Sequence, residues 1–216
     1  MTTRLAIFDC DGTLVDGQAA VCDAMEAGFA AAELPAPDRN EVRRMVGLSL
    51  PQAIRLLAPD VLEEQRVLAV QAYKDSFRNT RVSGQLHEPL YDGIAELLRR
   101  LDASGWQLAV ATGKSDRGLT ACLETHGLVD LFVSLQTADR HPSKPHPSMI
   151  EQCLADAGAE AAHTVMIGDT TFDMDMASNA SVRALGVSWG YHTPDELLEC
   201  GAEAVADDMA HLESLL

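Results

Sequence analysis

Polar side chains that can do chemistry together occur at four places along the chain. The first is the run DCDGT, in which Asp9 and Asp11 are separated by one residue and followed by Gly12. Two carboxylates this close repel each other and resist burial, so stability alone gives no reason to place them after an apolar run. The other three places contribute Thr112 with Gly113, Lys144, and Asp169 with Asp173.

These residue types suit the binding of a metal ion and a phosphoryl group. Converging carboxylates are hard oxygen ligands, and Mg²⁺ takes one or two of them, keeps several waters and uses phosphate oxygens for its remaining positions. A threonine hydroxyl, glycine N–H groups and a lysine supply hydrogen-bond donors and positive charge to phosphoryl oxygens. Gly12 and Gly113 lack a Cβ, so the backbone can approach a phosphate closely. The set therefore predicts a phosphoryl-transfer site that uses Mg²⁺.

Each feature also has an ordinary structural explanation. A Gly-Asp pair after a strand is often a turn, a single lysine is usually solvated, and Thr112 could be the N-cap of a helix that begins at TGK. The prediction therefore depends on the joint occurrence of the features, in this order and after apolar runs.

Short apolar runs are the elements that would position these residues. The continuous runs 4–9, 106–112 and 164–169 are typical of parallel strands buried on both faces, and each ends in one of the polar residues. Weaker strand candidates lie at 131–136, 183–189 and 202–206, and helical patterns lie at 92–104, 115–126, 147–157, 172–180 and 194–200. The alternation predicts a doubly wound (Rossmann-like), mostly parallel α/β sheet. Ligands of such sheets bind beyond the carboxyl ends of the strands, so the polar residues should share one edge.

Residues 16–85 interrupt this alternation. Apolar spacing indicates helices in the run QAAVCDAMEAGFAAAEL and at about 61–78, and the run SLPQ from Ser49 matches a capping box. We therefore predict a core domain formed by 1–15 and 86–216, with a small all-helical cap domain inserted after the first strand and seated over the edge as a lid.

The composition indicates a globular protein. The chain has 216 residues, 47% of them hydrophobic, which is enough for a sizeable core. A formal net charge of -17 argues against general affinity for nucleic acid or an anionic membrane. Residues 39–81 differ, with eight Lys or Arg against five Asp or Glu, which is either an ordinary solvated surface or an attraction for an anionic substrate. Without a long apolar run or a signal-peptide pattern, we expect a cytoplasmic protein.

Cysteines and histidines do not form a recognisable metal or redox motif in the sequence. The cysteines are Cys10, Cys22, Cys122, Cys153 and Cys200. They lie far apart, so we expect small buried thiols in a reducing compartment. His141 and His146 bracket a proline-rich loop, but no cysteine or acidic cluster is adjacent to complete a site. We interpret both as loop histidines.

Taken together, the motifs resemble those of the haloacid dehalogenase (HAD) superfamily of phosphohydrolases. D-x-D-G-T-[LV] from Asp9, the threonine at Thr112, Lys-Pro at 144–145 and G-D-x-x-x-D at 168–173 follow the order usual in that family. The resemblance covers the whole chain, because the family's commonest cap domain, the helical C1 type, is inserted after the first motif. Within the superfamily, the chain is similar to the phosphoglycolate phosphatase-like group.

The resemblance implies a role for each acidic residue. Asp9 would attack phosphorus and form an aspartyl-phosphate, and Asp11 would protonate the leaving oxygen and then take a proton from the attacking water. Asp169 would bind Mg²⁺ together with Asp9 and the backbone carbonyl of Asp11. Asp173 would be a further ligand or would orient the others. The two neighbouring aspartates would then divide the work, with pKa values separated by their surroundings.

The resemblance also implies a reaction class. Thr112, the Gly113 N–H and Lys144 would hold the phosphoryl oxygens of a small phosphorylated substrate. Family dehalogenases lack an acid at the position of Asp11, since a halide leaves without a proton. The implied activity is therefore Mg²⁺-dependent hydrolysis of a phosphomonoester.

Several alternatives remain at the level of the sequence. A sugar-phosphate mutase or a pyrophosphatase could share these motifs, because the outcome depends on what the lid admits. A phospho-acceptor signalling domain uses similar residues, but the D-x-D-G-T spacing and the insert argue against it. The substrate and the oligomeric state cannot be read from the sequence. The cap residues with a possible role in specificity are Arg43, Arg44, Leu48, Ser49, Lys74 and Arg78.

Overall fold

A six-stranded sheet forms the centre of the protein. The computed structural model describes residues 2–216, and within them every neighbouring pair of strands is parallel, in the order β3-β2-β1-β4-β5-β6. The strands are β1 (Arg4–Phe8), β2 (Trp106–Thr112), β3 (Phe132–Thr137), β4 (Thr164–Gly168), β5 (Arg183–Val187) and β6 (Ala204–Ala206). This topology confirms the predicted doubly wound α/β fold.

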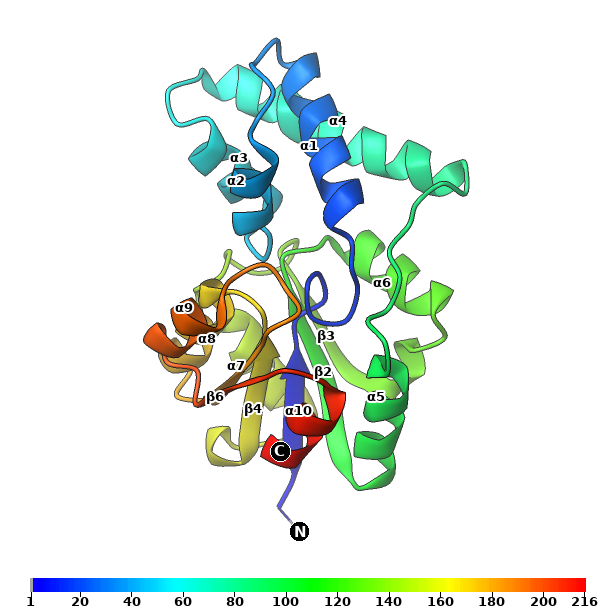
Figure 1. Cartoon of the computed structure of the whole chain (residues 1–216), viewed down its shortest axis with the longest axis vertical. Coiled ribbons are helices and arrows are strands. Elements are labelled where there is room, and N and C mark those ends of the chain that lie inside the picture. The colour runs from blue at the N-terminus through cyan, green and yellow to red at the C-terminus, as the bar shows by residue number, and fades with distance from the viewer. Residues whose placement is uncertain (1) are drawn as a thin grey trace.

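Helices cover both faces of the sheet and form a second group above one edge of it (Figure 1). The helices beside the sheet are α5 (Ile94–Ala103), α6 (Asp116–Thr125), α7 (Ser148–Ala157), α8 (Thr171–Asn179), α9 (Pro194–Glu199) and α10 (Met209–Leu215), with short 3₁₀ helices η1 (Val129–Leu131) and η2 (Ala161–His163). The group above the edge contains α1 (Gln18–Ala31), α2 (Arg39–Arg44), α3 (Leu50–Leu57) and α4 (Glu63–Val82).

Successive side chains of β1 point to opposite faces of the sheet, and this explains the three-layer core. Ala6 and Phe8 pack into a hydrophobic cluster with α5, α6 and α10, while Leu5 and Ile7 pack into a second cluster with α7, α8 and α9. All four side chains are fully buried, as expected for a parallel strand covered on both faces. The apolar run before the two aspartates is thus the centre of the core.

The observed elements of the core agree closely with the predicted ranges. Each predicted strand and each of the five predicted core helices begins and ends within two residues of its observed limits. The helices α2 and α10, with six and seven residues, were not among the predicted ranges. The predicted helix at 61–78 is α4, which continues to Val82.

The four inserted helices share a hydrophobic cluster of their own. Val21, Met25 and Phe29, which lie at four-residue spacing on α1, pack there with buried residues of α2, α3 and α4. The two segments that connect the insert to the sheet lie side by side: the Asp16 N–H donates to the Pro89 carbonyl at 2.8 Å. These observations support our proposal of a cap domain at 16–85 and a core domain at 1–15 and 86–216, of which residue 1 lies outside the described residues.

The predicted capping box at Ser49 is not formed. Ser49 is the N-cap residue of α3, but its side chain makes no capping hydrogen bond. Its backbone N–H instead donates to Ser143 Oγ of the core at 2.8 Å. The start of α3 is therefore fixed by a contact between insert and core, which a local sequence motif cannot reveal.

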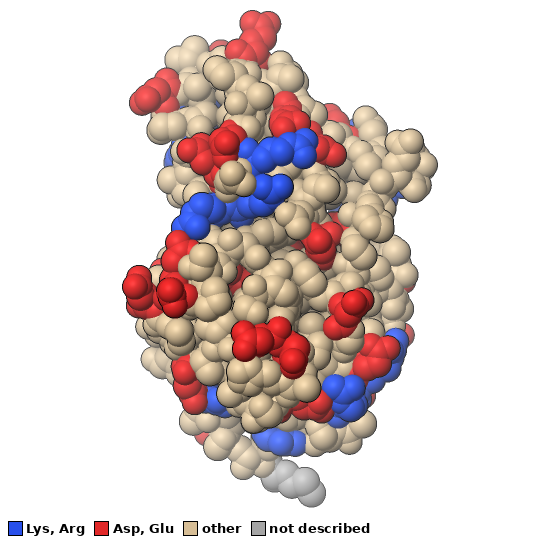
Figure 2. Space-filling model, in the orientation of Figure 1, with Lys and Arg blue, Asp and Glu red and all other residues tan. Residues whose placement is uncertain are grey.

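Charge is unevenly distributed over the surface. On the face in Figure 2, Lys and Arg side chains form a band on the insert just above its boundary with the core, whereas acidic side chains are spread over both parts. This agrees with the positive balance of residues 39–81.

In residues 2–216, no helix has both the length and the apolar character needed to cross a membrane. The cysteines are free thiols, and only Cys200 is not buried.

Candidate active site

The carboxyl ends of β1 and β4 and the start of α8 bring three of the predicted acidic residues together. Asp9 directly follows β1, Asp169 directly follows β4 beside it, and Asp173 lies in the first turn of α8. One carboxylate oxygen from each of these three residues can be chosen so that all lie within 4.8 Å of one another, and all three residues are buried. Thr112 is the last residue of β2, on the other side of β1.

One carboxylate oxygen of Asp9 contacts hydrogen-bond donors, and the other does not. Its Oδ1 accepts the backbone N–H of Cys10 at 2.7 Å and lies 2.9 Å from Lys144 Nζ. Its Oδ2 is buried without a hydrogen-bond partner among residues 2–216. Desolvation by burial raises the pKa of Asp9 to about 7; the neighbouring Asp173 adds to this, and Lys144 opposes it.

Lys144 is a fully buried cation between two of these carboxylates. Its Nζ lies 2.7 Å from Asp173 Oδ1 and 2.9 Å from Asp9 Oδ1. Burial by itself would lower the pKa of Lys144, but the two carboxylates outweigh burial and raise it. Asp173 is held in turn by Thr170, whose N–H and Oγ1 donate to Oδ2 at 3.1 and 2.7 Å. The lysine is therefore charged and fixed in position.

Asp169 is held by donors on both oxygens. Thr13 Oγ1 donates to Oδ1 at 2.9 Å, and the Tyr191 N–H donates to Oδ2 at 3.0 Å. Burial, followed by the charges of Asp9 and Asp173, raises its pKa well above the usual range. Gly12 passes so close, at φ +84°, that a Cβ there would lie 2.2 Å from Asp169 Oδ2. Only glycine fits at this position.

The three-carboxylate group is suited to a divalent cation. It offers hard oxygen donors in a buried place, where desolvation and the neighbouring carboxylates disfavour the ionised forms of Asp9 and Asp169. A bound cation would remove that penalty. The carboxylate of Asp11 is not in this group, which leaves the predicted backbone carbonyl as the means by which Asp11 could bind a metal.

The predicted phosphate donors lie at the end of β2. Thr112 is buried, and its Oγ1 accepts the Lys114 N–H at 3.2 Å, which leaves its hydroxyl proton available. Thr112 is not the N-cap of α6; Ser115 is, through a hydrogen bond from Gly118. At Gly113, a Cβ would lie 2.5 Å from the carbonyl oxygen of Leu48. A loop of the insert therefore rests directly on this glycine.

The sequence did not predict the groups that hold Asp11. Lys114 Nζ lies 2.9 Å from Asp11 Oδ1 and 2.6 Å from Glu88 Oε1, and Arg81 of α4 lies 3.5 Å from Glu88 Oε2. Burial raises the pKa of Asp11, and Glu88 adds to this, whereas Lys114 opposes it. The TGK run brings Lys114 near the site, but Glu88 reaches it only because the chain returns from the insert beside Val15 and Asp16, where it entered.

The candidate cap residues separate into two groups. Four of them line the cavity between the insert and the strand ends: Leu48, Ser49, Lys74 and Arg78. The other two do not. Arg44 forms an ion pair with Glu196 at 2.6 Å, and Arg43 donates to Asn40. Arg44 thus joins the insert to the core, and His192 Nε2, 3.1 Å from the Arg44 carbonyl, adds to that contact.

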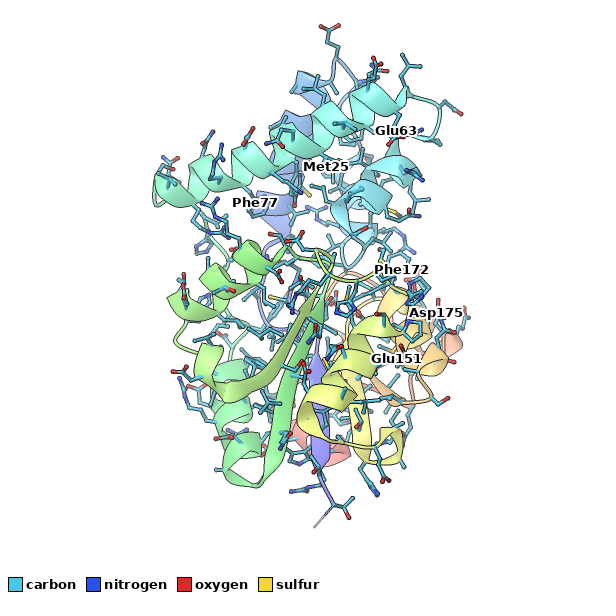
Figure 3. All side chains as sticks on the ribbon, turned by 180° about the vertical axis from the view of Figure 1, so that it is seen from behind. Met25, Glu63, Phe77, Glu151, Phe172 and Asp175 are labelled. Atoms are coloured by element: carbon cyan, nitrogen blue, oxygen red, sulfur yellow. The ribbon has the colours of Figure 1, made fainter. Side chains whose placement is uncertain are left out.

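The cavity has a volume of about 450 Å³. Its floor contains Asp9, Asp11, Thr112 and Gly113, and its upper walls come from α1–α4 and the loop before α3. Figure 3 labels two residues of these walls, Met25 on α1 and Phe77 on α4, above the strand ends. The site is therefore a chamber between the sheet edge and the insert.

Comparison with known proteins identifies the class. The family model described as haloacid dehalogenase-like hydrolase matches residues 6–187. The chain therefore belongs to the haloacid dehalogenase-like hydrolase family, as its motifs predicted. Membership of a hydrolase family also argues against the signalling-domain alternative.

Individual relatives match over nearly the whole chain. A protein named probable phosphatase IndB from Dickeya dadantii is 38% identical, covering 96% of this chain and 91% of the relative. A phosphoglycolate phosphatase from Agrobacterium fabrum is 31% identical, covering 100% and 95%. A crystal structure from Clostridium acetobutylicum, named as a predicted phosphatase, superposes with a TM-score of 0.88 over 100% of this chain and 98% of its own, at 24% identity. The last comparison supports the fold alone.

Proposed function

We propose that the protein is a Mg²⁺-dependent phosphatase that hydrolyses a small-molecule phosphomonoester through an aspartyl-phosphate at Asp9. The observation that carries this proposal is the unpartnered Oδ2 of Asp9 on the floor of the cavity. Asp9 belongs to the three-carboxylate group, and Thr112 and Gly113 line the same floor. The phosphatase names of the relatives from Dickeya and Agrobacterium support the same class.

The first step is attack by Asp9 on phosphorus. Lys144 and the Cys10 N–H hold Oδ1, so Oδ2 is the oxygen free to react. The Oδ2–P bond forms while the bond from phosphorus to the leaving oxygen breaks. Thr112, the Gly113 N–H and Lys144 stabilise the phosphoryl oxygens by hydrogen bonding and charge.

Asp11 moves the proton in both steps. Burial raises its pKa, which favours the protonated form needed to give a proton to the leaving oxygen. Asp11 is then ionised and takes a proton from the water that attacks the aspartyl-phosphate, which breaks the Oδ2–P bond and releases phosphate. Lys114 positions the carboxylate and stabilises it while it is ionised.

The three-carboxylate group would hold the metal ion. Asp9, Asp169 and Asp173, with the backbone carbonyl of Asp11, are the groups that we assign to it. When bound, Mg²⁺ would supply positive charge that offsets the charges of the phosphoryl oxygens and of the carboxylates.

The proposal predicts metal-dependent phosphate release. Purified protein with Mg²⁺ is expected to turn over at least one member of a panel of phosphomonoesters, measured as inorganic phosphate, and to lose activity in EDTA. Hexose 1-phosphates belong in the panel because a mutase would convert them to 6-phosphates without releasing phosphate. Pyrophosphate belongs there to test the pyrophosphatase alternative. Absence of phosphate release from every ester, or full activity in EDTA, would contradict the proposal.

A further inference from the structure

The walls of the cavity differ sharply from its floor. The floor is charged, whereas the part lined by the insert is largely apolar. Its apolar side chains include Val21, Met25, Val46 and Leu48, all of them buried. A cavity of about 450 Å³ is within the roughly 300–1,000 Å³ typical of sites for drug-sized molecules. A two-carbon leaving group such as glycolate would leave most of this apolar space unfilled.

An aromatic pair lies on this apolar wall. Tyr73 and Phe77 are one turn apart on α4, with ring centroids 5.2 Å apart and planes tilted by 34°, and both line the cavity. Aromatic side chains pack favourably with a further ring in offset or edge-to-face arrangements, so this pair can contact a ring of the substrate.

The position of the aromatic pair relates it to the leaving group. Lys114 Nζ lies over the Phe77 ring, 5.9 Å from its centroid, and the same Nζ lies 2.9 Å from Asp11 Oδ1. Under the proposed function, Asp11 gives its proton to the leaving oxygen. The part of the substrate attached to that oxygen would therefore lie in the region of the cavity that Phe77 lines.

The cations near the floor do not favour a leaving group that carries a carboxylate close to phosphorus. Lys114 is already paired with Asp11 and Glu88, and Arg81 contacts Glu88. Arg78, higher on the wall, is paired with Asp75 at 2.7 Å. Lys74 and Arg117 also line the cavity, but both are exposed, at the open side of the chamber.

We propose that the leaving alcohol of the substrate carries a flat, ring-sized apolar group that packs against Tyr73 and Phe77. This inference rests on the proposed phosphatase function and adds the chemical class of the substrate. The class is a phosphomonoester of a ring-bearing alcohol larger than glycolate.

Three esters of primary alcohols test the inference without large differences in leaving-group chemistry: 2-phenylethyl phosphate, ethyl phosphate and phosphoglycolate. For the wild-type protein with Mg²⁺, we expect kcat/KM for 2-phenylethyl phosphate to exceed that for ethyl phosphate by about 30-fold, equivalent to about 2 kcal/mol. It should exceed that for phosphoglycolate as well. In Phe77→Ala, the ratio of 2-phenylethyl to ethyl phosphate is expected to fall at least about fivefold, since the ring loses one face of its contact.

A matched variant on the same helix controls for indirect effects. Val67 is 62% exposed on α4 and does not line the cavity, so Val67→Ala should keep the wild-type ratio. Equal or faster hydrolysis of ethyl phosphate or phosphoglycolate by the wild type would overturn the inference and leave the phosphatase function intact. Release of phosphate from none of the three, nor from the wider panel, would overturn both. If circular dichroism shows that Phe77→Ala does not fold, the ratios of kcat/KM measured for the wild-type protein alone test the inference.

Discussion

Replacing Asp9 with asparagine is expected to lower turnover by at least about 10⁴-fold while the protein remains folded. The amide cannot supply the nucleophilic oxygen, but it has nearly the same shape and can still accept from Lys144 and the Cys10 N–H. Phosphate release measures the loss. Asp175→Asn is the matched control, because Asp175 is an exposed acid on α8, the helix that also carries Asp173 (Figure 3). More than about 1% of wild-type turnover in Asp9→Asn would contradict the assignment of the nucleophile.

The same substitution has an expected effect on stability. The pKa of Asp9 is about 7 in the folded protein against an ordinary value of 3.8, so between these pH values the folded state holds a proton that the unfolded state has lost. The free energy of unfolding of the metal-free protein should therefore fall as the pH rises from about 4 to about 7. Asp9→Asn removes this contribution. We expect a higher Tm than wild type at pH 8 in EDTA, and no such gain at pH 4.

Removing the charge of Lys144 is expected to cause the largest loss of stability. In Lys144→Met, Asp9 and Asp173 lose the cation that lies within 2.9 Å of both. Breaking a buried ion pair on one side typically costs about 3–5 kcal/mol, which denaturant unfolding in EDTA would measure. Turnover should fall by at least about 100-fold, because a phosphoryl-binding group is lost too.

Two further measurements make the Lys144 prediction specific. Mg²⁺ should raise the Tm of Lys144→Met more than that of the wild type, since a divalent cation can replace part of the missing charge. Lys74→Met, at an exposed position, should change the free energy of unfolding by less than about 0.5 kcal/mol. A Lys144→Met protein as stable as wild type in EDTA would show that the carboxylates do not depend on this lysine.

Much of the candidate site could be predicted because the position of its residues follows from the neighbouring sequence. A polar residue that directly follows a continuous apolar run must lie at the carboxyl edge of a parallel sheet, and this places Asp9, Thr112 and Asp169. Lys144 and Asp173 were predicted with them, and the structure shows why a lysine belongs there: it neutralises two buried carboxylates.

The remainder depends on contacts between distant segments. Glu88 reaches Lys114, and Arg81 reaches Glu88, only because the chain leaves the insert beside the point where it entered. The backbone N–H of Tyr191, which holds Asp169, belongs to a loop without a sequence signature. Arg44, a candidate substrate contact, pairs with Glu196 of α9 instead. No periodicity or motif encodes such pairings.

The side chains of the insert that face the cavity could not be predicted either. Its helices follow from apolar spacing, but which side chains face the cavity depends on how α1 and α4 pack together above the sheet edge. The aromatic pair of Tyr73 and Phe77 is spaced like an ordinary apolar helix face in the sequence. The contact of Phe77 with Lys114, and the place of both rings on the cavity wall, are visible only in the folded protein.

Trapping the aspartyl-phosphate tests the central claim most directly. Borohydride reduces an acyl phosphate to an alcohol, which would convert Asp9 to homoserine in protein quenched during turnover with Mg²⁺ and a hydrolysed ester. Peptide mass spectrometry should find homoserine at position 9, and not in Asp9→Asn or in protein quenched without substrate. Phosphate release without homoserine at position 9, or with homoserine at another aspartate, would contradict the account.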